Sequence, residues 1–146
     1  MRVLFYFCCL LATLAFAWWR GGRAERLGAL FLVAGSLLTM LAGSPAARRF
    51  ASVETGILVV DVAILAAFLW LALFSDRYWP LWIAALQLIG VLAHFAKLAD
   101  LEMPRNGYAF LQAIWSYPMM LAIMIGTLSF HRARIRKIVE GTLRPS

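Results

Sequence analysis

Long apolar runs alternate with short polar segments along the chain of 146 residues. The third run is 21 residues long and apolar almost throughout. At 1.5 Å per residue, a helix of that length is about 30 Å long, which matches the hydrocarbon core of a bilayer. We therefore predict an all-α fold, a polytopic membrane helical bundle. Its five transmembrane helices are expected at about residues 3–19, 27–43, 55–75, 81–99 and 108–130.

The composition indicates that lipid covers much of this chain. Hydrophobic residues make up 64% of it and charged residues only 14%, whereas a soluble domain is about 45–50% apolar and about 25% charged. Too little polar surface remains to cover a water-soluble globule. We expect one transmembrane helical-bundle domain over residues 1–146, which ends in a basic tail at 131–146.

Basic residues lie in the short connections and in the tail. With five spans, nine Lys and Arg residues fall on one side of the membrane and five on the other. The richer side should be cytoplasmic, so the N-terminus is expected outside and the C-terminus in the cytoplasm. This pattern predicts a membrane protein whose basic tail meets anionic lipid headgroups. The sequence shows no nucleic-acid recognition fold and no basic–aromatic platform, so we do not expect nucleic acid binding.

The first run also has the features of a secretory signal. Arg2 precedes an apolar core, and residues 15–17 (AFA) form a cleavage-like tripeptide. Cleavage would place the nine basic residues of the richer side outside the cell, against the positive-inside rule. We therefore predict a retained helix, with removal of the first run as the alternative.

One acidic residue, Asp61, lies inside the third run, six residues from its start and so about 9 Å below the outer face. His94 lies five residues before the outer end of the fourth run, about 8 Å down by the same rise. The two runs are joined by a very short connection and should pack side by side. Gln87 is seven residues before His94 and shares its helix face.

Two further polar residues are expected at the same depth. Gln112 and Ser116 are four residues apart on the fifth run, hence on one face, and Pro118 interrupts that run with a kink. A buried aspartate in a span costs about 2.5–3.5 kcal/mol to insert and normally faces a partner inside the bundle. We predict an outward-facing polar layer that binds a proton, an ion or a small ligand. The alternative is that Asp61 and His94 only fasten two helices. The candidate site residues are Asp61, His94, Gln112, Ser116 and Gln87.

No cofactor, metal or catalytic residue is indicated. Cys8 and Cys9 are adjacent in an apolar run, which is typical of packing rather than of a metal site or a disulfide. His94 and His131 would lie roughly 25 Å apart by helix rise, too far for the two axial ligands of one haem. Nucleophile-elbow, phosphate-loop and HExxH motifs are absent from the sequence. We therefore expect a protein that is not an enzyme.

Three stretches carry a family resemblance: residues 54–61 (ETGILVVD), 75–82 (SDRYWPLW) and 115–118 (WSYP). They resemble a family of uncharacterised short polytopic bacterial inner-membrane proteins. The resemblance covers most of the chain and implies the class of protein, but it assigns no activity and no residue roles.

The pattern as a whole favours a small non-enzymatic integral inner-membrane protein of accessory or sensor type. The alternative is an oligomeric channel-like or transporter-like protein that uses Asp61 and His94 for ion or proton coupling. Five short helices enclose little space, so this alternative needs several copies. The expected partners are the lipid bilayer and either a homo-oligomer or a larger membrane complex, without nucleic acid.

Overall fold

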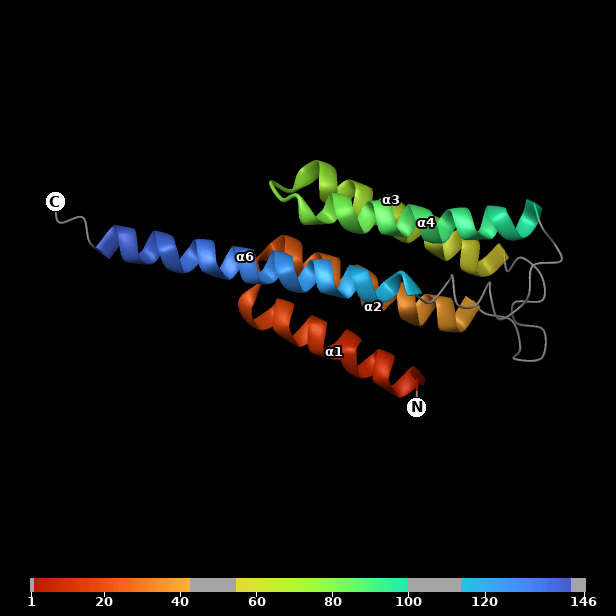
Figure 1. The fold of residues 1–146 in the computed structure, drawn as a ribbon, viewed down its shortest axis with the longest axis horizontal. Coiled ribbons are helices and arrows are strands. Elements are labelled where there is room, and N and C mark those ends of the chain that lie inside the picture. Colours follow the sequence, from red (N-terminus) through yellow and green to blue (C-terminus); the bar gives the residue numbers. More distant parts are fainter. Residues whose placement is uncertain (1, 43–54, 100–113, 143–146) are drawn as a thin grey trace.

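The structure, a computed structural model, describes residues 2–42, 55–99 and 114–142. The elements assigned in these ranges are all α-helices, which confirms the predicted all-α class for this part of the chain (Figure 1). They are α1 (Arg2–Arg20), α2 (Arg23–Ala42), α3 (Thr55–Phe74), α4 (Trp79–Ala99) and α6 (Ser116–Thr142).

Three of the described helical segments are long and apolar enough to cross a membrane: Arg23–Ala42, Thr55–Phe74 and Trp79–Ala96. The prediction of five spans is not confirmed, because the apolar part of α1, Leu4–Arg20, is shorter than these three. The described part of α6 becomes strongly basic after Phe130. Residues 108–113, where the fifth span was expected to begin, lie outside the described residues.

Helix α2 begins four residues earlier than expected, at Arg23, because the local sequence caps it there. The first helical hydrogen bond runs from the Arg26 N–H to the Gly22 carbonyl at 3.2 Å. Glu25 then turns back, and its Oε2 accepts a hydrogen bond from the Gly22 N–H at 2.9 Å. A glutamate at the third helical position that binds the capping residue's N–H is one half of a capping box. The charged residues of this turn therefore belong to the helix rather than to a loop.

The chain turns at Trp115, and α6 starts at the next residue. Pro118 therefore lies in the first turn of α6, where its missing N–H leaves no helical hydrogen bond unmade. From there α6 continues without a break through the basic segment to Thr142, well past the predicted end of the span at residue 130. Figure 1 shows its C-terminal part extending beyond the other helices.

The five described helices form a closed ring. Each contacts the next in chain order, α6 closes the ring on α1, and α2 also contacts α6. Helices α3 and α4 form an antiparallel hairpin, as their short connection predicts (Figure 1). The side chains that fill the ring include Leu10, Phe68, Ile83 and Ile123, none more than 2% exposed.

Trp79, at the start of α4, packs between two glycines from different helices. A Cβ on Gly28 of α2 would lie 2.5 Å from the Cη2 atom of this indole, and a Cβ on Gly126 of α6 would lie 2.5 Å from its Cδ1. No real Cβ fits so close to a ring atom. The two glycines are therefore what allows α2, α4 and α6 to meet around one large side chain.

We expect Gly126→Ala to lower the free energy of unfolding by about 1–3 kcal/mol, since overpacking of a well-filled core has this cost. Gly90→Ala is the matched control: a Cβ there meets nothing within 4 Å, and alanine favours a helix more than glycine does. Denaturation in detergent, followed by circular dichroism, measures both. An equal loss of stability in the two variants would contradict the close packing of Trp79.

Candidate functional site

Asp61 and His94 lie in contact near the open end of the α3–α4 hairpin. The His94 Nε2 atom is 2.9 Å from Asp61 Oδ2. The His94 side chain is fully buried, and the Asp61 side chain is 16% exposed. Because α3 and α4 run antiparallel from a short connection, a residue early in α3 meets one late in α4. The two groups that the sequence places at similar depth are thus on facing sides of their helices.

Gln87 joins this pair from α4. Its Nε2 donates to the backbone carbonyl of Asp61 at 3.2 Å and to Asp61 Oδ1 at 3.3 Å. Gln87 is only 8% exposed. Both carboxylate oxygens of Asp61 are therefore engaged by α4, one by the amide and one by the imidazole. We call Asp61, Gln87 and His94 the polar trio.

The chemistry open to the polar trio is the sharing of a proton. An ionised carboxylate only accepts hydrogen bonds, so a bond to it requires the proton on Nε2 of His94. With a neutral imidazole the pair carries one negative charge; with a second proton, on Nδ1, it becomes an imidazolium–carboxylate ion pair. Binding one proton thus changes the net charge of the pair from −1 to zero while its contact is kept.

Of the other two predicted site residues, the structure describes only Ser116. Gln112 lies outside the described residues. Ser116 is the first residue of α6 and is half-buried, and none of the hydrogen bonds between described residues joins it to the polar trio. Equal depth in the membrane does not fix the direction in which a helix turns a side chain. Among the described residues, the hydrogen bonds of the site therefore join the polar trio, which comes from α3 and α4.

Within residues 2–42, 55–99 and 114–142 there is no group of three or more His, Cys, Asp or Glu side chains that could hold a metal ion. Cys8 is exposed and Cys9 half-buried, both as free thiols on α1. His131 lies at the opposite end of the bundle from His94, where its Nε2 is 2.8 Å from Arg20 Nη1.

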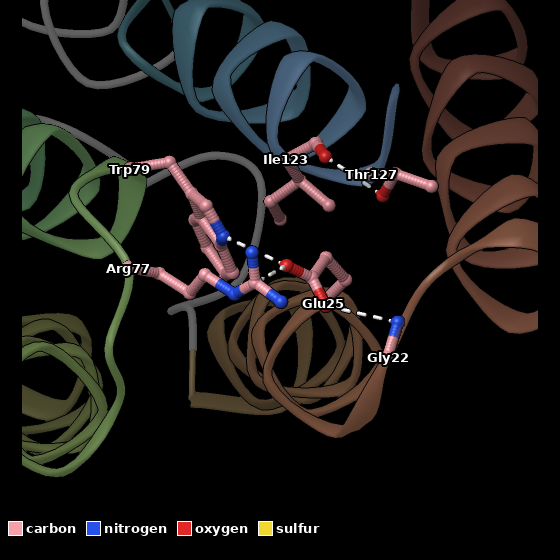
Figure 2. A network of polar contacts seen from close by, with 6 residues as sticks. All are labelled: Gly22, Glu25, Arg77, Trp79, Ile123 and Thr127. Atoms are coloured by element: carbon pink, nitrogen blue, oxygen red, sulfur yellow. Dashed lines mark hydrogen bonds and ion pairs between the residues drawn. The ribbon is translucent and has the colours of Figure 1, made fainter. Parts of the chain in front are cut away.

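A second buried carboxylate, Glu25, was missed by the sequence expectations. It is 1% exposed and lies near the start of α2, beside the connection between α3 and α4 (Figure 2). The indole N–H of Trp79 donates to its Oε1 at 3.2 Å, and the Gly22 N–H donates to its Oε2. Arg77 Nε lies 3.8 Å from Oε1. We call Gly22, Glu25, Arg77 and Trp79 the Glu25 network.

The Glu25 network ties three parts of the chain together at the basic end of the bundle. Gly22 comes from the turn between α1 and α2, and Arg77 and Trp79 come from the hairpin connection and the start of α4. The Arg77 guanidinium also lies over the Phe130 ring of α6, 4.8 Å from its centroid. The sequence signal that could have found this network is a glutamate three residues after a helix-capping glycine.

The fold and these contacts define the class: a helical bundle with three helices able to cross a membrane and a buried Asp–His–Gln contact within one helical hairpin. Comparison of the chain with models of known protein families, with curated proteins and with solved structures found no match.

We expect Glu25→Ala to lower the free energy of unfolding by about 1–3 kcal/mol for each buried donor that it leaves unpaired, the Trp79 indole and the Gly22 amide. Glu25→Gln keeps one good acceptor and should lose less. Glu140→Ala removes the same charge from an exposed position on α6 and should have no comparable effect. Tryptophan fluorescence during denaturation in detergent measures all three. A wild-type midpoint for Glu25→Ala would contradict a stabilising role for the network.

Proposed function

We propose that this chain is a small, non-enzymatic, polytopic protein of a bacterial inner membrane, of accessory or sensor type, in which the polar trio is a proton site. The observation that carries the proposal is the 2.9 Å contact between the fully buried His94 and Asp61 inside two apolar helices. Ionisable groups within spans are costly, and they commonly mark proton or ligand sites.

A proton fits this site better than a larger ligand does. The three side chains of the polar trio touch one another directly, at 2.9–3.3 Å. A proton needs only such a hydrogen-bonded pair, whereas a small molecule needs a space between its ligands. A groove between α4 and α6 is lined by other described residues and by none of the trio.

The position of the polar trio suggests what the proton does. One end of the α3–α4 hairpin is closed by the connection at residues 75–78, and the trio joins the other end. Opposite unit charges attract more strongly than a charge and a neutral imidazole, above all where the surroundings are apolar. Protonation of the imidazole should therefore tighten the open end of the hairpin, and loss of that proton should loosen it.

The membrane setting is supported by the distribution of charge over the described bundle. Arg20, Arg23 and Arg26 lie at the same end as Arg77 and the basic part of α6, as the Arg20–His131 and Arg77–Glu25 contacts require. We propose that this basic end faces the cytoplasm, that the N-terminus faces outward, and that α1 and the segment leading into α6 complete five spans.

The proton site predicts that the open end of the hairpin responds to pH. Spin labels at Val59 and Phe95, both exposed, would report the distance between α3 and α4 by dipolar EPR, with Cys8 and Cys9 replaced by alanine. We expect a shorter and narrower distance distribution at acidic pH, where the ion pair is formed, than at basic pH.

Asp61→Asn and His94→Gln are the matched variants, since each keeps a hydrogen-bonding side chain but cannot form the ion pair. Both should lose the pH response. Labels at Phe74 and Tyr78, exposed positions at the closed end, should show none in any variant. If the α3–α4 distance distribution of the wild type does not change with pH, the proton site is contradicted and the contact between Asp61 and His94 only holds the two helices together.

A flux measurement separates the sensor from the transporter-like alternative. Liposomes that contain the protein and an internal pH dye should show no proton flux above that of empty liposomes. Flux that Asp61→Asn abolishes, while the variant still inserts, would instead support an oligomeric channel or transporter that uses the same residues.

A further inference from the structure

An apolar groove of about 310 Å³ runs along the outside of the bundle between α4 and α6. These two helices contact each other over part of their length (Figure 1). The side chains that line the groove are all apolar or aromatic: Trp79, Trp82, Leu86, Pro118, Leu121, Ala122 and Ile125. On each helix the lining extends over eight residues, or seven steps of helix rise, about 10 Å.

The face of α6 that lines the groove becomes cationic at the basic end of the bundle. The lining positions 118, 121, 122 and 125 follow the spacing of one helix face. The same spacing continues to Arg132 and Arg136, both exposed. Arg132 lies about 10 Å beyond Ile125, and helical side chains lean toward the N-terminus, here toward the groove. One stripe of α6 is thus apolar and then basic.

The α4 side of the groove places its mouth near the same end. Trp82 lines the groove close to the start of α4 and is 70% exposed. Tryptophan is enriched at the level of lipid headgroups. Along the surface, the apolar groove is followed by an exposed indole and then by two guanidinium groups. A phospholipid presents matching groups in the same order: its acyl chain, its interfacial region and its phosphate.

We propose that this groove holds an acyl chain of one anionic phospholipid, whose phosphate is bound by Arg132 and Arg136. Charge favours a lipid over a second copy of the chain. Two copies in one membrane share an orientation, so a second copy in the groove would bring its own basic helix end against the first. Basic sites between spans are known to take anionic headgroups. This inference is independent of the proton site at the other end of the bundle.

Native mass spectrometry of the full chain in mild detergent tests the proposal with two lipids of identical chains, dioleoyl phosphatidylglycerol and dioleoyl phosphatidylcholine. We expect one phosphatidylglycerol to be retained per chain in preference to phosphatidylcholine. The double variant Arg132→Gln/Arg136→Gln should bind the first phosphatidylglycerol roughly tenfold or more weakly, since each cation near a lipid surface contributes on the order of 1 kcal/mol.

The matched control is Arg134→Gln/Lys137→Gln. It removes the same charge from exposed positions of α6 that lie off the groove face, and it should retain the lipid. All four residues are exposed near the end of the helix, so the fold should be unaffected. An equal loss of phosphatidylglycerol binding in the two double variants would show that the lipid responds only to the total positive charge of α6, and it would overturn the proposed site. If the wild-type protein is a dimer and Ala122→Trp dissociates it, the groove holds a second copy of the chain and the lipid proposal is overturned.

Discussion

The arrangement of α3 and α4 depends on the cost of placing a carboxylate inside an apolar helix. Asp61 sits within the most hydrophobic helix of the bundle, and lipid offers it no hydrogen bond. Side chains of α4 offset this cost: His94 hydrogen-bonds to one carboxylate oxygen of Asp61 and Gln87 to the other. A register or rotation of α4 that removed these contacts would leave Asp61 without the α4 side chains that satisfy it. The polar trio therefore specifies how this hairpin pairs, and it also creates the group that we propose as the proton site.

The hairpin is held by a carboxylate at each end. Near the closed end, Glu25 binds the Trp79 indole and ties α2 to the start of α4; near the open end, Asp61 binds His94. The two differ in what they can do. Glu25 accepts from a peptide N–H and an indole N–H, which do not change their charge at ordinary pH, so its network is suited to fixed packing. Asp61 faces an imidazole, the one side chain whose charge commonly changes near neutral pH. A fixed end and an adjustable end in one hairpin suit a sensor.

The sequence carried enough information for part of this arrangement. Depth along each helix brought Asp61 and His94 to one level, the short connection paired their helices, and a spacing of seven placed Gln87 with His94. The same reasoning did not show which way Ser116 turns, because depth carries no information on rotation about a helix axis. Glu25 was not singled out among the charged residues, and only the hydrogen bonds that it accepts from Gly22 and Trp79 distinguish it from a surface charge. Apolar length alone also suggested five spans, whereas the apolar part of α1 is shorter than the three candidate spans and the described α6 owes much of its length to a basic extension.

The contact between Asp61 and His94 in a bilayer is the central claim, and solid-state NMR tests it most directly. Protein with ¹⁵N-labelled histidine and ¹³C-labelled aspartate, in lipid bilayers, allows dipolar dephasing between the His94 Nε2 and the Asp61 Cγ to be measured. Asp61→Asn, which lacks the labelled aspartate at this position, assigns the signal. A separation under about 4 Å, as a hydrogen bond requires, is the predicted result. An absence of dephasing in the wild type would contradict the account.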